Sequence, residues 1–327
     1  MSKLFDRFGR KHTYLRISVT DRCNLRCTYC MPAGGIPWKE HSEILSYEEI
    51  RRITKLFIEL GVTKIRLTGG EPTIRKNIED LIGKLSGLQG VETLAMTTNG
   101  ISLRDKAFVY KECGLNTINI SLDTLKKERF IQITKRDYFE QIMEGISSSI
   151  DAGFSQLKLN VVVMKGVNDD EILDFIDFVK DKPINVRFIE LMPFKENNWD
   201  LSYFVPYAQI KKTIEAQYKL LPIKREASNV AKDFCIRGLL GTVSFITSMS
   251  ESFCSTCNRV RLTADGKLKT CLFDNTEIDL KKAIRNGATD CELTDMILYA
   301  LYNKPLEHKP VEELVNEENR RMVEIGG

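Results

Sequence analysis

The sequence predicts an α/β protein with an N-terminal partial, TIM-like (βα)6 barrel and a C-terminal extension. Two observations lead to this prediction. From residue 15 to about residue 193, short β-rich apolar runs alternate with stretches of helical periodicity. Repeated βα units form parallel sheets with right-handed crossovers. Six units can be counted, which is too few to close an eight-stranded barrel, so we expect an open one.

The predicted barrel strands are short apolar runs bounded by turn residues. They are expected over 15–20, 64–68, 93–97, 117–121, 158–163 and 185–190. The first helix has a clear start, because Ser46 and Glu49 form a capping box, and Gly61 ends it. A second helix is expected over 77–86. The motifs TDRC, GGEP, TNG and LD follow the first four strands, where functional groups of βα barrels gather.

The C-terminal region is expected to cover the open barrel. We place the domain boundary between residues 1–193 and residues 194–327. Residues 194–240 look irregular, and a strand is expected over residues 242–247. A hairpin around Asp265-Gly266 is expected from 259–263 and 267–272, and helical segments follow to the end.

The composition limits the classes of function. The 327 residues include 48 basic and 45 acidic ones, a formal net charge of +3, which argues against a general nucleic-acid-binding protein. No segment approaches the roughly 18 apolar residues of a membrane helix, and the first residues lack a signal-peptide pattern. We therefore expect a cytoplasmic protein with no membrane partner.

Nine cysteines make up the most informative feature of the composition. An odd number without a secretion signal does not suggest disulfides. Six of them form two groups of three. The others, Cys113, Cys235 and Cys291, are scattered and are expected in the core.

The first group has the spacing Cys-x3-Cys-x2-Cys and comprises Cys23, Cys27 and Cys30. Thiolates suit both iron and zinc. Three thiolates on a four-iron cube leave one iron open to an outside ligand. The spacing alone also allows a zinc site, whose fourth ligand would be His41 or His12.

The second group has the spacing Cys-x2-Cys-x13-Cys and comprises Cys254, Cys257 and Cys271. A zinc site would need a fourth ligand, and the next cysteine is Cys291. Arg259 and Arg261 alternate along the predicted strand, so they face the same side and could clamp a triphosphate. A solvated strand face is the simpler alternative for these two arginines.

Two motifs resemble the radical S-adenosylmethionine (SAM) superfamily. The first cysteine group with Tyr29 resembles its cluster-binding signature, and Gly69-Gly70-Glu71-Pro72 resembles the loop that holds the SAM amino group. The resemblance implies a [4Fe-4S] cluster whose open iron chelates SAM. An electron from the cluster then cleaves SAM to a 5′-deoxyadenosyl radical, within a partial barrel of the radical SAM type.

Longer stretches resemble the GTP 3′,8-cyclase family, and the similarity runs from about Gly9 to the last residue. The stretches are GRKHTYLRISVTDRCNLRCTYCMP, RLTGGEP, TTNG, SLD, KLNVVVMKGVND, FIELMP, FCSTCNRVRLTADGKLKTCL and the final two glycines. Thr73, Ile74 and residues 219–235 depart from the pattern. The implied reaction is hydrogen abstraction from the ribose C3′ of GTP and attack on guanine C8, the first step of molybdenum cofactor biosynthesis.

The resemblance also implies roles for individual residues. A second [4Fe-4S] cluster would lie on Cys254, Cys257 and Cys271. SAM would contact Tyr29, Gly69, Gly70, Glu71, Ser121 and Met192. GTP would contact Arg16, Arg66, Thr97, Lys158, Arg259, Val260 and Arg261. Gly326 and Gly327 would reach the active site as catalytic residues, although chain ends by themselves usually fray.

The implied partners are GTP as substrate, a flavodoxin-like or ferredoxin-like electron donor, and cyclic pyranopterin monophosphate synthase as the recipient of the product. A homodimer is compatible with the sequence but not specified by it. Two other hypotheses stay open from the residues alone. One is a peptide-modifying radical SAM enzyme with an auxiliary cluster, and the other is a non-catalytic zinc or electron-transfer protein.

Overall fold

The strands form one curved sheet whose middle part is parallel. The computed structural model describes residues 4–32, 34–154, 156–197, 199–224, 230–316 and 319–326. Within these residues the strand order is β12-β11-β10-β1-β2-β3-β4-β5-β6-β9-β8-β7. The first six strands are β1 (Tyr14–Ser18), β2 (Lys64–Thr68), β3 (Thr93–Thr98), β4 (Thr117–Ser121), β5 (Leu157–Val163) and β6 (Ile184–Glu190), all parallel to their neighbours. The predicted partial (βα)6 barrel is confirmed.

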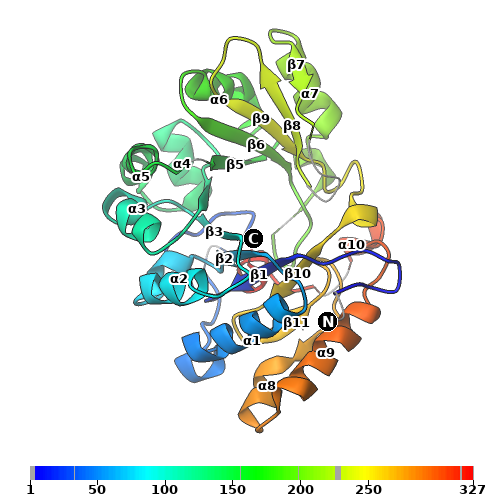
Figure 1. Cartoon of the computed structure of the whole chain (residues 1–327). Helices are drawn as coiled ribbons and strands as arrows, with labels where there is room; N and C mark the ends of the chain where they lie inside the picture. The colour runs from blue at the N-terminus through cyan, green and yellow to red at the C-terminus, as the bar shows by residue number, and fades with distance from the viewer. Residues whose placement is uncertain are drawn as a thin grey trace.

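Helices cover the convex side of this sheet, as Figure 1 shows. They are α1 (Tyr47–Glu59), α2 (Ile78–Ser86), α3 (Leu103–Glu112), α4 (Lys127–Thr134), α5 (Phe139–Asp151) and α6 (Ile172–Val179). The start of α1 is as predicted, because Ser46 Oγ accepts a hydrogen bond from the Glu49 N–H while the Glu49 carboxylate accepts one from the Ser46 N–H. The apolar faces of helices and strands form one main hydrophobic core between them.

The C-terminal region extends the barrel sheet at both edges. β9 (Thr242–Ile246) pairs parallel with β6, and β10 (Arg259–Leu262) pairs parallel with β1. Antiparallel strands continue each edge, namely β8 (Lys232–Ile236) and β7 (Leu220–Pro222) on one side and β11 (Lys267–Lys269) and β12 (Ile278–Asp279) on the other. The order ends at β7 and β12, so the sheet is open.

One expectation for the C-terminal region was wrong. Residues 194–240 are not irregular throughout, because they contain α7 (Tyr207–Glu215) and the β7–β8 pair. The predicted hairpin at Asp265-Gly266 is confirmed by the antiparallel pairing of β10 and β11. The final helices are α8 (Leu280–Arg285), α9 (Asp290–Tyr302), α10 (Val311–Leu314) and α11 (Met322–Ile325). Over the described residues, no helix has the length and apolar character needed to cross a bilayer.

Candidate functional site

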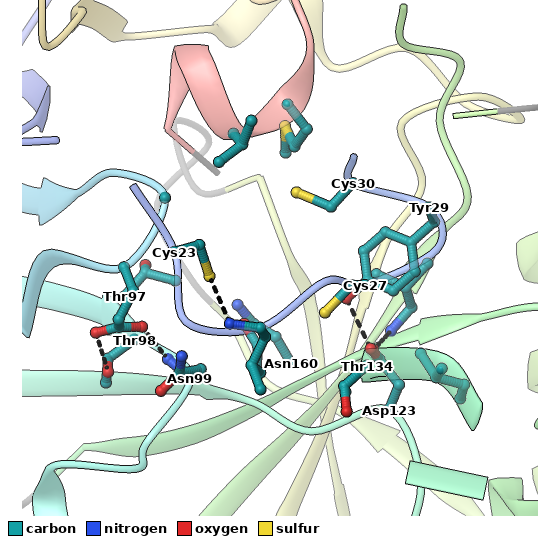
Figure 2. A pocket seen from close by; sticks show the side chains of 18 of the residues that line it. Cys23, Cys27, Tyr29, Cys30, Thr97, Thr98, Asn99, Asp123, Thr134 and Asn160 are labelled. Carbon is teal, nitrogen blue, oxygen red and sulfur yellow. Dashed lines mark hydrogen bonds between the residues drawn. The ribbon is translucent and has the colours of Figure 1, made fainter. Parts of the chain in front are cut away.

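The loop after β1 carries the first three cysteines and is held to the barrel by its backbone. The Arg26 N–H donates to the Thr134 carbonyl oxygen at 2.8 Å, and the Thr28 N–H donates to the Ile133 carbonyl oxygen at 3.0 Å, both at the end of α4. The three thiols line one cavity of about 180 Å³, shown in Figure 2. The backbone bonds thus fix the positions from which the thiols face this first cavity.

The first three thiols are chemically suited to a cation. Burial, with the Glu71 carboxylate nearby, raises the pKa of Cys23 to about 12. Burial likewise raises the pKa of Cys30 to about 12 and that of Cys27 well above its usual value. Thiolates in this cavity need a positive charge to be stable, and iron ions supply one. The residues therefore fit a cluster held by Cys23, Cys27 and Cys30.

The GGEP loop lies directly against the loop after β1. The Gly70 N–H donates to the Thr20 carbonyl oxygen and the Glu71 N–H to the Arg22 carbonyl oxygen, both at 2.7 Å. A Cβ atom on Gly70 would lie 2.3 Å from the Arg22 oxygen, so only glycine permits this approach. A Cβ atom on Gly69 would also be too close, at 2.7 Å from the Thr20 carbonyl oxygen.

The Glu71 carboxylate fixes the loops around the first cavity. It accepts hydrogen bonds from Thr73 Oγ1 at 2.6 Å, from Thr98 Oγ1 at 2.7 Å and from the Asn99 N–H at 2.6 Å. Burial raises its pKa, although these hydrogen bonds oppose the shift. Glu71 thus ties the ends of β2 and β3 together at the cavity it lines.

Ser121, Met192 and Tyr29 line the same cavity. The Tyr29 hydroxyl donates to Asp123 Oδ2 at 2.7 Å, and Asp123 Oδ1 accepts from the Val162 N–H at 2.9 Å. Burial raises the pKa of Asp123 to about 6, although these hydrogen bonds oppose the shift. Asp123 had no predicted role, although the LD motif that contains it, at the end of the fourth strand, was a signal.

A second cavity, of about 140 Å³, is lined by the second cysteine group together with Arg16, Arg259 and Arg261. Cys254 begins a short 3₁₀ helix, and Cys257 precedes β10. Burial alone would raise the pKa of Cys257, but the charges of Arg259 and Lys304 outweigh it and lower the pKa to about 6. Cys257 therefore favours the thiolate form, which binds metals.

The two cysteine groups lie at opposite ends of the same pair of strands. β1 and β10 run parallel, with Arg16 opposite Arg261. The first group follows β1 in the chain, whereas Cys254 and Cys257 come before β10. The five residues of β1 span about 16 Å at the usual rise per residue. The expectation that functional groups gather at the carboxyl ends of strands holds for the first group only.

Cations fill the barrel interior between and beside the two groups. The strand register places Arg16 next to both Arg66 and Arg261. A third cavity, of about 290 Å³, is lined by the basic residues Arg16, Lys64, Arg66, Lys158, Arg187 and Arg259. It shares Arg16, Asn119, Arg187, Ile246 and Arg259 with the second cavity, which in turn shares Thr97, Asn160, Ile189, Met192 and Met322 with the first. The three cavities therefore adjoin along one path.

Tyr14 shows how positive this interior is. Its hydroxyl accepts hydrogen bonds from Arg66 Nε and from Arg16 Nη1, and its ring lies 4.9 Å from Lys64 Nζ. Burial would raise the pKa of Tyr14, but the three cations outweigh it and lower the pKa to about 6. A surrounding that stabilises a phenolate so strongly also favours a phosphate anion.

The C-terminal tail enters the site. Gly326 is buried with a φ of +80°, and a Cβ there would lie 2.3 Å from Thr68 Oγ1. Its carbonyl oxygen accepts a hydrogen bond from Arg261 Nη1 at 2.8 Å. Met322 lines the first and second cavities. The chain end therefore does not fray as far as Gly326, and Gly327 lies outside the described residues.

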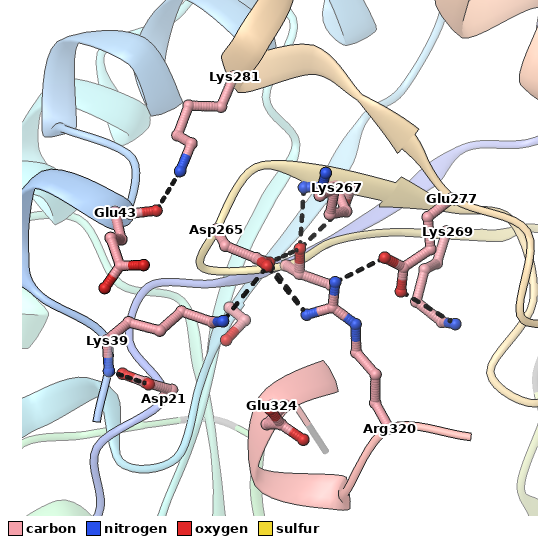
Figure 3. A network of polar contacts seen from close by, with 12 residues as sticks. Asp21, Lys39, Glu43, Asp265, Lys267, Lys269, Glu277, Lys281, Arg320 and Glu324 are labelled. Carbon is pink, nitrogen blue, oxygen red and sulfur yellow. Dashed lines mark hydrogen bonds and ion pairs between the residues drawn. The ribbon is translucent and has the colours of Figure 1, made fainter. Parts of the chain in front are cut away.

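An ion-pair network holds this tail, as Figure 3 shows. Arg320 Nη1 lies 3.1 and 3.2 Å from the two carboxylate oxygens of Asp265, and Arg320 Nη2 donates to Glu277 Oε2 at 2.5 Å. Lys39 Nζ also lies 3.6 Å from Asp265. The β10–β11 hairpin thereby anchors the segment that leads into α11.

Comparisons with known proteins agree with this architecture. Residues 17–179 match the radical SAM superfamily, and residues 184–310 match the family Molybdenum Cofactor Synthesis C. Among solved structures, SuiB of Streptococcus suis bound to S-adenosylmethionine has a TM-score of 0.62 at 14% identity, covering 90% of this chain and 66% of that one. The enzyme anSMEcpe with bound AdoMet has a TM-score of 0.60 at 15% identity, covering 92% and 80%. These two structures share the fold.

Curated relatives are much more similar. The mitochondrial GTP 3′,8-cyclase of Arabidopsis thaliana is 48% identical over 99% of this chain and 83% of that protein. The GTP 3′,8-cyclase of Moorella thermoacetica is 47% identical over 98% and 99%. This chain belongs to the GTP 3′,8-cyclase family. It also spans about half of the molybdenum cofactor biosynthesis protein 1 of Mus musculus, at 47% identity over 51% of that protein.

The family assignment confirms the resemblance seen in the sequence and implies a [4Fe-4S] cluster and SAM as cofactors of the radical SAM part. The predicted contact of Val260 with GTP stays a prediction for this GTP 3′,8-cyclase chain. Its side chain is fully buried in the main core, which leaves its backbone for such a contact. Lys64 and Arg187 line the cationic cavity and were missed, although both lie in predicted strands.

The structure also shows the positions of the other three cysteines and of His12, a candidate ligand in the zinc alternative. Cys291 is exposed on α9, so its expected core position was wrong, whereas Cys113 and Cys235 are partly buried. His12 lies beside the second cysteine group through Lys304, and not at the first. Among the residues described, no three His, Cys, Asp or Glu side chains are grouped for a single metal ion. A cubane binds each thiolate at a different iron, so it does not need that grouping.

Proposed function

We propose that this chain converts GTP to (8S)-3′,8-cyclo-7,8-dihydroguanosine 5′-triphosphate, the first step of molybdenum cofactor biosynthesis. The observation that carries the proposal is the adjoining series of cavities, with one cysteine group at each end of β1 and β10 and seven lysine and arginine residues along the path. A triphosphate carries about four negative charges, and such a path suits it.

The first cavity would hold the radical-generating cluster and SAM. Cys23, Cys27 and Cys30 would bind the cluster, which supplies the electron that cleaves SAM to a 5′-deoxyadenosyl radical. The backbone of Gly69 and Gly70 and the side chains of Tyr29, Ser121 and Met192 would orient SAM, since all line this cavity. Glu71 would act by fixing the loops.

The second and third cavities would hold GTP. The triphosphate would lie among Arg16, Arg66 and Lys158. Lys64 and Arg187, which line the same cavity, support this placement. The guanine would lie toward the second cysteine group, with Arg259 beside it. The ribose then falls near Thr97, which lines the first and second cavities, so that its C3′ hydrogen faces the radical.

We further propose that Cys254, Cys257 and Cys271 hold a second [4Fe-4S] cluster. Its support is the positive surroundings that favour thiolate at Cys257. After attack on C8, one electron and one proton are needed to reach the product. A cluster on these cysteines would be suited to supply the electron, and a nearby arginine such as Arg259 could donate the proton. Arg261 and Gly326, which are hydrogen-bonded together, would complete the wall of this cavity, with Gly327 next in the chain.

Several features stay predictions from the sequence. They are the boundary between 1–193 and 194–327, the flavodoxin-like or ferredoxin-like donor, transfer of the product to a separate synthase, a homodimer and a cytoplasmic location. A peptide-modifying enzyme with an auxiliary cluster is the second candidate, since the SuiB structure shares the fold.

The test is an anaerobic reaction of the reduced, iron-loaded chain with SAM and GTP. We expect 5′-deoxyadenosine and the cyclised dihydro-GTP in equal amounts, and about eight irons per chain. The Cys254→Ser variant is the matched control, and it should still cleave SAM while forming no cyclised product. Cleavage of SAM by the unaltered chain without any cyclised nucleotide would refute the proposed reaction.

A further inference from the structure

A buried lysine lies under the second cysteine group. Lys304 follows α9, and the hydrogen bond from its N–H to the Leu301 carbonyl oxygen, at 3.1 Å, turns the chain back toward β10. Only 2% of Lys304 is exposed. Nothing in its sequence context distinguishes it from the other lysines of the chain, yet its side chain ends beside Cys257.

The ammonium group of Lys304 has one acceptor for each of its three protons. Nζ lies 2.9 Å from the Arg259 carbonyl oxygen, 3.0 Å from His12 Nε2 and 3.5 Å from Cys257 Sγ. An ammonium group donates and does not accept. His12 Nε2 must therefore be the acceptor, which leaves the imidazole neutral with its proton on Nδ1. That nitrogen is buried without a hydrogen-bond partner.

The charge of Lys304 is not balanced by a carboxylate. Among the described side chains, no acidic group lies within ion-pair distance of its Nζ, and the nearby Asp6 pairs with Arg10 at 2.5 Å. Arg10 also donates to the Cys254 carbonyl oxygen at 2.7 Å. A buried ammonium ion is costly unless a negative charge offsets it. Among the side chains that the structure describes, the Cys257 thiol is the only group in contact with Nζ that can carry a negative charge.

The first cysteine group has the opposite surroundings. Its cavity is lined by the carboxyl groups of Glu71 and Asp123. The second cavity is lined by Arg16, Arg259 and Arg261, and Lys304 lies behind it. Hydrogen bonds to ligand sulfurs and nearby charge set the reduction potential of an iron–sulfur cluster. The first cysteine group thus lies among carboxyl groups, whereas the second lies among cations.

We propose that Lys304 is a positioning residue that raises the reduction potential of the second cluster by donating an N–H···S hydrogen bond to the Cys257 thiolate. The inference rests on the proposed second cluster. The reduced cluster carries one more negative charge than the oxidised cluster, so a fixed cation against its ligand stabilises the reduced form. His12 and the Arg259 carbonyl oxygen hold the ammonium group in place.

The test isolates the second cluster in the full-length chain. The parent protein carries Cys23→Ser, Cys27→Ser and Cys30→Ser, so that iron binds only at the second group. Into it are introduced Lys304→Met, which keeps the length of the side chain but not the charge, and Lys304→Arg, which keeps the charge. The control is Lys55→Met, an exposed lysine of α1. Each protein is loaded anaerobically, its iron is counted, and its midpoint potential is measured by titration followed by electron paramagnetic resonance.

We expect the Lys304→Met protein to have a lower midpoint potential than its parent at about four irons per chain, with Lys304→Arg in between and Lys55→Met unchanged. Loss of iron in Lys304→Met but not in Lys304→Arg would also support the proposal, because charge is what separates the two. An unchanged midpoint in Lys304→Met overturns it, as does equal loss of iron and of thermal stability in both variants. A parent that binds no iron would overturn the second cluster itself, and the inference with it.

Discussion

The carbonyl oxygen of Gly326 accepts a hydrogen bond from Nη1 of Arg261, 2.8 Å away. This contact joins the penultimate residue of the chain to a strand of the barrel edge. It also distinguishes Arg261 from Arg259, whose Nη2 lies 3.7 Å from Cys257 Sγ and which makes no hydrogen bond to the part of the tail that the structure describes. The two arginines of the RVR segment therefore differ in their contacts, since Arg261 holds the tail and Arg259 lies against a cysteine sulfur.

The first prediction follows from that difference. Arg259→Ala should weaken GTP binding and leave the tail in place, whereas Arg261→Ala should weaken GTP binding and also free the tail. Carboxypeptidase digestion followed by mass spectrometry would measure release of the last residues. Both variants should keep their iron. Equal protection of the tail in the two proteins would contradict the assignment.

A second prediction concerns the anchor of the tail. Arg320→Gln removes hydrogen bonds to Asp265 and Glu277, each of which involves a charged group and contributes about 1.5–3 kcal/mol. We expect faster carboxypeptidase digestion and at least about tenfold slower cyclisation, with SAM still cleaved. Lys84→Gln, which breaks an exposed ion pair with Glu48, is the control and should change neither rate.

The third prediction concerns the triphosphate. Arg187→Met should weaken GTP binding by roughly 10- to 100-fold, because a hydrogen bond to a charged group is lost in the cationic cavity. Binding of guanosine, which lacks phosphates, should change little. Calorimetric titration with both ligands measures the difference. A similar loss for both ligands would place Arg187 at the base and not at the phosphates.

The fourth prediction tests the close approach of the two loops. Gly70→Ala would put a Cβ atom 2.3 Å from the Arg22 carbonyl oxygen, so the GGEP loop must move away and SAM binding should be lost. Gly83→Ala is the matched control, since nothing lies within 4 Å of a Cβ there and the residue is inside α2. That change should stabilise the chain by about 0.5–1 kcal/mol. Equilibrium binding of SAM and thermal unfolding report the two effects.

The fifth prediction is a pH dependence. The pKa of Asp123 is raised to about 6 by burial in the folded, iron-free chain, compared with 3.8 when unfolded. A raised pKa means that stability is fully present below about pH 4 and declines as pH rises to about 6. The decline is about 3 kcal/mol for a shift of about two units. Urea unfolding of Asp123→Asn should lack this decline, while the unaltered chain shows it.

The sequence was informative wherever the signal is local. The six strands of the barrel, the capping box at Ser46 and both cysteine groups follow from patterns within short stretches of sequence, of at most 18 residues for the second cysteine group. The parallel pairing of β10 with β1 could not be predicted this way, because it joins Tyr14 to Arg259 across most of the chain. The role of Lys304 was hidden for the same reason, since its partners His12 and Cys257 lie far away in sequence.

Other residues were missed because their environment cannot be seen from their neighbours. Cys291 has the residue type of a core position, but the face of α9 that carries it is exposed. Lys64 begins a strand as many surface lysines do, and the pairing of β2 with β1 places it opposite Tyr14 in the cationic cavity. Val260 differs from these two residues, because the alternation of the RVR strand already predicts that its side chain lies on the opposite face from Arg259 and Arg261, where the structure has the core.

The pairing of β1 with β10 also affects the order in which the protein folds during translation. During synthesis, β1 leaves the ribosome early, but its neighbour on one side is not made until residues 259–262 emerge. Domains generally fold as units during translation, and long-range parallel pairing is slow. One edge of β1 therefore stays unpaired in the nascent barrel until β10 has been synthesised. Arg16, which faces Arg261 across that edge, gains its full set of cationic neighbours only when nearly the whole chain has been translated.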